Sequence, residues 1–153
     1  MSIQSNLTIT IQNRKAFKKI LDSLSIEQIN KIPQGFNNNI IWNAAHVLSI
    51  QQMLTYALGN LPFTLPKDQI LEFNMGTRPQ KEYVDEFIDQ IKSQFFSTHD
   101  QLVQDISENK FETFNPFMTA IKVEVINIET AIAFNQYHEA LHMGYMLNIR
   151  RFL

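Results

Sequence analysis

Cysteine is missing from this sequence of 153 residues. Its absence excludes disulfide bonds, thiolate metal ligands and a cysteine nucleophile supplied by the chain itself. A metal site in this protein would therefore have to use nitrogen and oxygen ligands.

Concentrated positive charge is also missing. The 13 Lys and Arg residues stand against 15 Asp and Glu residues, the formal net charge is −2, and the basic residues form no cluster. Proteins that bind nucleic acids neutralise phosphates with grouped Lys and Arg. The charge pattern therefore gives no support to nucleic-acid binding.

Long apolar runs are absent as well, and none approaches the length of a membrane span. Residues 1–17 lack the charged start and apolar core of a signal peptide. The hydrophobic fraction of 44% and the charged fraction of 18% are ordinary for a globular protein. We therefore expect a cytoplasmic location with no membrane partner, and the length predicts a single domain over residues 1–153.

Apolar residues recur at helical spacing along most of the chain, which predicts four long helices. These are expected over residues 5–24, 38–58, 80–109 and 127–153. The alternation of Thr and Ile at 8–11 resembles a strand and leaves the start of the first helix open. Asn38 or Asn39 is expected to cap the second helix, and Asn127 the last.

The connection between the second and third helices, residues 59–79, carries three Pro and two Gly and is long for a compact domain. This length predicts a crossover or a lid over a pocket, with Pro66 opening a short helix. Residues 111–126 are β-branched and aromatic, which predicts an extended segment or a marginal hairpin. The pattern as a whole predicts an all-α fold, namely a four-helix bundle with a long crossover connection between helices two and three.

Three of the four histidines are predicted to face the interior of the protein. His138 and His142 are four residues apart in the last helix, so their imidazoles share one face. A zinc-like ion takes three or four ligands, and His46, one turn after Trp42 in the second helix, is expected to supply another. A shared metal ion would give all three buried rings a partner. His99 is expected at the surface or at the edge of the core.

Residues 138–142 also spell HEALH, which matches the H-E-x-x-H pattern of zinc peptidases with Glu139 as the base. The extended form of that pattern needs a Gly and a third His, but Tyr145 and Asn148 stand in those places. We therefore expect Glu139 to be a solvent-facing helical residue rather than a base. Glu139, Tyr145 and Asn135 are the candidate catalytic residues, and the last two are expected on the inward face beside the histidines.

The run WNAAHVLSIQQMLTYALGNLP resembles the DinB-like family of DNA-damage-inducible bundle proteins. The FNPF segment and the run VEVINIETAIAFNQYHEALHMGYMLNIRRF extend the resemblance over essentially the whole chain. It implies a four-helix bundle with a divalent metal, often zinc or nickel, held by one His of the second helix and an H-x-x-x-H pair of the last. Those places correspond to His46, His138 and His142. Relatives in the family include bacillithiol and mycothiol transferases and a maleylpyruvate isomerase.

The sequence thus favours a metal-dependent transferase or hydrolase that activates a low-molecular-weight thiol or water at a site of three histidines. The alternative is a non-catalytic, stress-related bundle that binds a metal or another ligand. The expected partners are a small-molecule substrate, with a low-molecular-weight thiol as one candidate, and a second copy of the chain in a homodimer.

We expect the open position of such a site to face a cleft. Its walls would be Phe63, Phe73 and Met75 from the long connection, with Tyr145 and Asn135 from the last helix. The alternative is that the connection only covers one side of the bundle.

Overall fold

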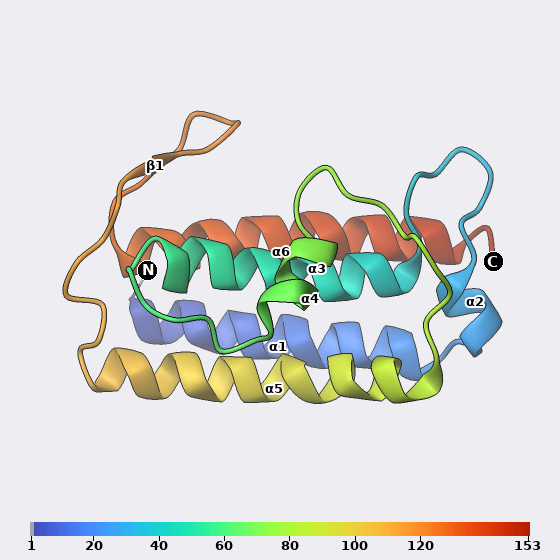
Figure 1. Ribbon diagram of the computed structural model, residues 1–153, viewed down its shortest axis with the longest axis horizontal. Coiled ribbons are helices and arrows are strands. Elements are labelled where there is room, and N and C mark those ends of the chain that lie inside the picture. Colours follow the sequence, from blue (N-terminus) through green and yellow to red (C-terminus); the bar gives the residue numbers. More distant parts are fainter. Residues whose placement is uncertain (1) are drawn as a thin grey trace.

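The body of the protein is built from long helices that run side by side (Figure 1). The computed structural model describes residues 2–153 and is all-α apart from one small hairpin. Its elements are α1 (Ile3–Asp22), α2 (Ile26–Asn30), α3 (Ile40–Gln52) continued by a π-helical turn η1 (Met53–Ala57), α4 (Lys67–Glu72), α5 (Asp85–Ser107), β1 (Phe117–Met118), β2 (Glu124–Val125) and α6 (Ile128–Arg150).

Two predicted caps set the starts of the helices that carry the inward histidines. Asn39 begins α3, and its side-chain oxygen accepts a hydrogen bond from the Trp42 N–H at 2.9 Å. Asn127 begins α6, where its side chain accepts from the Thr130 N–H at 2.9 Å and Thr130 Oγ1 accepts in return from the Asn127 N–H at 3.1 Å. These bonds satisfy N–H groups that have no partner within the helix, and they fix the phase of each helix.

Helix α3 is the most enclosed element. All of its residues except Ile50 are buried. It packs against α6 and α5, while α4 from the long connection covers a further side. Helix α1 lies against both α5 and α6. Side chains on α3, including those that face α6 and the connection, are therefore enclosed along almost the whole helix.

Helix α5 starts at Asp85, five residues later than predicted. The residues before it are held in an extended run, because the Tyr83 N–H donates to Asn30 Oδ1 at 2.8 Å and the Tyr83 hydroxyl donates to Glu72 Oε1 at 2.8 Å. Asp85 and Glu86 then occupy the first turn, where negative charge favours a helix start. The Thr and Ile alternation near the N-terminus lies inside α1, which begins right after its cap Ser2.

The predicted hairpin and the predicted short helix both occur. Strands β1 and β2 pair antiparallel, with Phe117 opposite Val125, and the hairpin stands away from the helices (Figure 1). The short helix α4 follows Pro66 as predicted. Within residues 2–153, no helix combines the length and the apolar character that spanning a bilayer requires.

Candidate metal centre

The three histidines predicted to face inward meet where α3 packs on α6. His46 comes from α3, and His138 and His142 come from consecutive turns of α6. One nitrogen of each ring lies within 4.8 Å of the others, so the three could together hold a metal ion. Their ring centroids are 5.1 Å (46 to 138), 4.6 Å (46 to 142) and 4.5 Å (138 to 142) apart.

Two of the rings are held through Nδ1. His46 Nδ1 donates to the carbonyl oxygen of Phe73 at 2.6 Å, and His142 Nδ1 lies 2.8 Å from Asn43 Oδ1. The Asn43 amide is itself oriented, because its Nδ2 donates to the Asn39 carbonyl at 2.7 Å. Both Nδ1 atoms therefore carry the proton, which leaves each Nε2 with a free lone pair for a metal. Such outer hydrogen bonds are what orient metal-ligating histidines.

The third ring lacks a partner. His138 Nδ1 is buried and makes no hydrogen bond within residues 2–153. A buried polar atom without a partner is costly. A metal ion bound by the lone pair of this nitrogen would remove that deficit, so the donor set fits a bound cation.

The long connection supports His46 from its outer side. The Trp42 ring stacks on the His46 ring with centroids 4.5 Å apart and planes 14° apart. Trp42 Nε1 donates to Thr77 Oγ1 at 3.1 Å. The connection therefore fixes His46 twice, through the Phe73 carbonyl and through Thr77 and Trp42.

The Phe73 ring and the Met75 side chain do not wall a cleft, contrary to prediction. The Phe73 ring is fully buried and packs on Tyr83 and Phe87, so Phe73 meets the site through its carbonyl and not through its ring. The Met75 side chain is 81% exposed and does not wall an enclosed space. Phe63 is partly buried against the apolar core. The connection thus holds the His46 ring in place.

Burial keeps the three imidazoles neutral. Desolvation lowers the pKa of His46, lowers the pKa of His138 to about 2 and lowers the pKa of His142 to about 3. The neighbouring rings add to the effect on His138 and His142, and the Arg14 guanidinium lowers the pKa of His138 further. A metal ion binds only the neutral ring, so the site is in the required protonation state at pH 7.

The match to a known family covers this whole arrangement. The family model described as the DinB superfamily matches residues 9–146, which include all three histidines. The chain belongs to the DinB superfamily. No curated protein matches it.

In this DinB superfamily member, Glu139 lies in a second buried polar cluster beside the histidines. The prediction that Glu139 faces solvent was therefore wrong. The Glu139 side chain is 0% exposed and pairs with Arg14 of α1, whose Nη2 is 2.7 Å and Nε 3.1 Å from Glu139 Oε1. Asn135 Nδ2 donates to the same oxygen at 2.7 Å, and Arg14 Nη2 also donates to Gln51 Oε1 at 3.0 Å. A carboxylate neutralised in this way is not the free base of a zinc peptidase, which removes the main support for a peptidase function.

The burial of Arg14 was not predicted, although its spacing along α1 indicates it. It follows Leu7 and Thr10 and precedes Phe17 at alternating steps of three and four residues, so it lies on the buried face of α1. A charged residue at such a position predicts a buried partner. The cluster also lies between two apolar groups, one that includes Phe17 and one that includes Leu7.

Of the three candidate catalytic residues, only Tyr145 is open to solvent. Asn135 is buried and its amide is used by Glu139. Tyr145 was predicted to face inward but is 50% exposed, because its position falls at the edge of the buried stripe of α6. Its ring centroid is 5.9 Å from that of His142. Tyr145 therefore stands where a molecule approaching the histidines would touch the protein.

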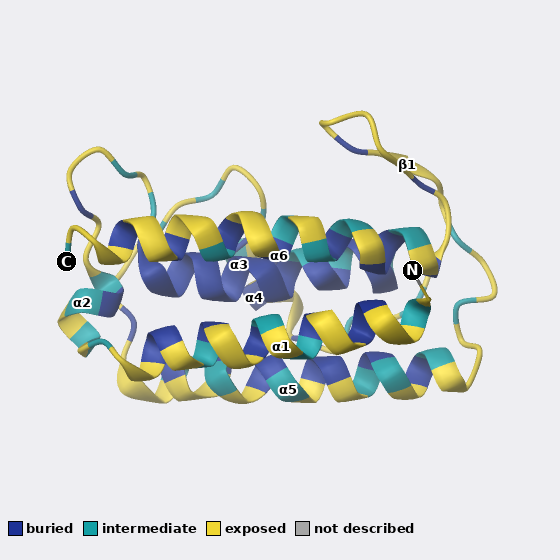
Figure 2. Ribbon diagram, turned by 180° about the vertical axis from the view of Figure 1, so that it is seen from behind, coloured by how far each residue is buried: buried dark blue, intermediate teal, exposed yellow. Residues whose placement is uncertain are grey.

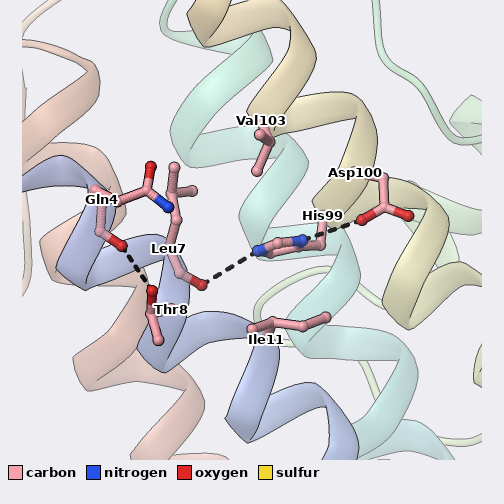
Figure 3. Close-up of a pocket in the computed structure, with 7 residues that line it drawn as sticks. All are labelled: Gln4, Leu7, Thr8, Ile11, His99, Asp100 and Val103. Atoms are coloured by element: carbon pink, nitrogen blue, oxygen red, sulfur yellow. Dashed lines mark hydrogen bonds and ion pairs between the residues drawn. The ribbon is translucent and has the colours of Figure 1, made fainter.

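His99 lies outside the metal centre, as predicted, but it is more buried than expected. It is 9% exposed, and its Nε2 lies 3.1 Å from the carbonyl oxygen of Leu7. The ring lines a groove of about 300 Å³ between α1 and α5. Figure 3 shows it among the other residues that line this groove. A backbone oxygen thus satisfies this histidine without an ion.

The low pKa values predict how the metal-free protein responds to acid. The unfolded chain protonates its histidines near pH 6.5, whereas folded His138 and His142 stay neutral down to about pH 2 and 3. The free energy of unfolding should therefore fall as the pH drops below 6.5, by up to about 1.4 kcal/mol per pH unit for each buried histidine. Urea denaturation of the metal-free protein at several pH values between 7 and 5 measures how the free energy of unfolding changes with pH. Most Asp and Glu side chains titrate below this window, so the histidines dominate the change. An unchanged free energy of unfolding over that range would show that the folded rings protonate normally.

Proposed function

We propose that this protein is a metal-dependent transferase or hydrolase that holds a divalent ion with His46, His138 and His142. The observation that carries the proposal is the convergence of three neutral imidazoles, two of which are fixed through Nδ1 with Nε2 free. The four long helices form a four-helix bundle, and the connection that carries α4 is the crossover between the second and third of them.

The donor set narrows the choice of ion. Three imidazoles without thiolate suit zinc or nickel among the common divalent ions. Three protein ligands leave a coordination position free, as in catalytic sites, and a divalent ion lowers the pKa of a thiol or water bound there. Zinc and nickel are therefore the ions to test first.

The residues around the three histidines determine which molecules can reach a bound ion. His138 is partly exposed and Tyr145 is half-exposed beside His142, so a small molecule reaches the histidines along this edge of α6. Glu139 is neutralised by Arg14 and does not serve as a base. We propose a small-molecule substrate, and the absence of cysteine in the chain is consistent with a low-molecular-weight thiol supplied by a cosubstrate.

A thiol-conjugation screen tests the catalytic proposal. Zinc- or nickel-loaded protein is incubated with a low-molecular-weight thiol and a panel of electrophiles, and thiol consumption is followed. We expect consumption above the uncatalysed rate that is lost in His46→Ala and reduced in Tyr145→Ala. A hydrolase would instead consume activated ester or amide substrates without thiol.

A non-catalytic binding function is the second candidate. It is favoured by the burial of Glu139 in an ion pair with Arg14, which leaves this carboxylate unable to transfer protons. Tight metal binding without turnover, both in the thiol-conjugation screen and with activated esters or amides, would support this alternative over catalysis.

The hydrogen bond from His142 predicts a graded effect on metal affinity. Asn43→Ala removes the acceptor of His142 Nδ1, which frees the ring to rotate and change tautomer. Loss of such an outer partner typically weakens metal binding by about 10–100-fold. Competition with a chelating dye measures the change. Asn38→Ala is the control, because Asn38 lies just before α3 and is not the hydrogen-bond partner of His142 Nδ1; this variant should bind metal normally. Equal affinity of the Asn43 variant and the wild type would show that this bond does not orient the ring.

A further inference from the structure

The carbonyl oxygen that holds His46 lies at the end of a very short helix. Phe73 is the C-terminal cap of α4, which has six residues. A helix of this length has little stability of its own, so its position depends on contacts with the rest of the protein. The last carbonyl groups of a helix have no partner within it, and His46 Nδ1 is the partner of the Phe73 carbonyl. The orientation of the His46 ring therefore depends on how α4 is held.

A pair of buried glutamines links α4 to α5. Gln69 Nε2 donates to Gln94 Oε1 at 2.7 Å, and Gln94 Nε2 donates back to Gln69 Oε1 at 3.0 Å. Gln90, one turn earlier on α5, donates a further bond to Gln69 Oε1 at 3.3 Å. Both members of the pair are buried, with exposed fractions of 7% and 9%. The two amides keep these bonds only while α4 and α5 hold this one arrangement.

Two further hydrogen bonds connect the glutamine pair to His46. The Gln69 carbonyl accepts from the Phe73 N–H at 3.2 Å, and the Phe73 carbonyl accepts from His46 Nδ1 at 2.6 Å. The Phe73 ring packs on two other aromatic rings, but apolar contacts are non-directional. Hydrogen bonds between amides, in contrast, require particular distances and angles. The glutamine pair therefore sets the rotation of α4 about its own axis and, with it, the direction of the Phe73 carbonyl.

We infer that Gln69 and Gln94 are positioning residues for the metal centre. Helix α3 is buried along nearly its whole length, as Figure 2 shows, so the segments packed around it orient its side chains. Neither glutamine forms a hydrogen bond with a histidine within residues 2–153, and both act through Phe73 on the ring whose Nε2 is free for an ion. The inference rests on the proposed metal site.

Gln94→Leu tests the inference, first in the metal-free protein. It removes both bonds of the pair and leaves the Gln69 amide with Gln90 alone. We expect the Nδ1 proton of His46, followed by NMR in ¹⁵N-histidine-labelled protein, to exchange with solvent at least about 10-fold faster than in the wild type. The dissociation constant for zinc or nickel, measured by competition with a chelating dye, should rise about 10-fold, as for loss of an outer partner of a ligand.

Gln104→Leu is the matched control. Gln104 is exposed on the same helix, and its amide donates to Glu108 within α5. The same substitution at this position should change neither the exchange of the His46 proton nor the dissociation constant.

The double variant Gln69→Leu with Gln94→Leu separates positioning from stability. Replacing both partners of a buried hydrogen bond by apolar groups is nearly neutral for stability, so the urea midpoint should return close to that of the wild type. The dissociation constant should stay raised about 10-fold, because an apolar contact does not restore the direction of the Phe73 carbonyl. A pair that only stabilised the fold would recover stability and affinity together.

The inference is overturned if Gln94→Leu leaves either the exchange of the His46 proton or the dissociation constant unchanged, or if the double variant regains wild-type affinity. A wild type that binds neither zinc nor nickel would instead contradict the proposed function. In that case the exchange of the His46 proton in the metal-free protein would still decide whether the glutamine pair positions the ring.

Discussion

Replacing His46 with Ala should weaken divalent metal binding by at least about 100-fold. Two imidazoles rarely hold a divalent ion alone, and loss of even an outer hydrogen bond to a ligand costs up to about 100-fold. The rest of the fold also holds the His46 ring in place, through the Phe73 carbonyl and the stacked Trp42 ring. Isothermal titration of zinc or nickel into metal-free protein measures the affinity directly.

His99→Ala is the control for this measurement. His99 is the only other histidine and is as buried as His142, but its Nε2 meets a backbone oxygen and it lies outside the cluster of three. We expect its metal affinity to match that of the wild type. Equal loss in the two variants would mean that the ion binds elsewhere or that buried histidines affect binding only through folding.

Replacing Arg14 with Met should lower the free energy of unfolding by about 3–5 kcal/mol, because it leaves the Glu139 carboxylate buried and unpaired. Both side chains are fully buried, and the pair joins α1 to α6. The loss is a large fraction of the roughly 5–15 kcal/mol that stabilises a typical domain. Urea denaturation at pH 7 measures it.

The double variant Arg14→Met with Glu139→Leu separates charge from packing. Removing both charges together should recover most of the lost stability, since buried ion pairs are often replaced by apolar residues at little cost. A double variant as unstable as Arg14→Met alone would indicate that packing around Arg14, rather than its charge, holds the helices together. Lys18→Met, an exposed change on the same helix, should alter stability by less than about 1 kcal/mol.

The cluster of three histidines was predictable because local rules determine it. Asn39 and Asn127 cap α3 and α6 as the sequence indicates, and helical spacing then places His46, His138 and His142 inward. Two inward faces on neighbouring helices bring the three rings together without knowledge of the rest of the fold. The Pro and Gly content of residues 59–79 predicted a long connection. It did not predict that this connection holds the His46 ring through Phe73 and Thr77.

The partner of Glu139 could not be found by the same rules. Arg14 is 125 residues away in sequence, and helical spacing places it on the buried face of α1 without indicating which residue it pairs with. Burial of both residues depends on how α1 packs against α6, which no local pattern specifies. The same limit explains Tyr145, because a position at the edge of a buried stripe is inside or outside according to the neighbouring helix.

An anomalous-difference map tests the metal centre most directly. Crystals of the protein loaded with zinc or nickel would be measured on both sides of the absorption edge of that metal. We expect one strong peak in contact with His46, His138 and His142 that disappears in crystals of the His46→Ala variant. A peak bound to His99 instead, or no peak among the three rings, would contradict the assignment of this site as a metal centre.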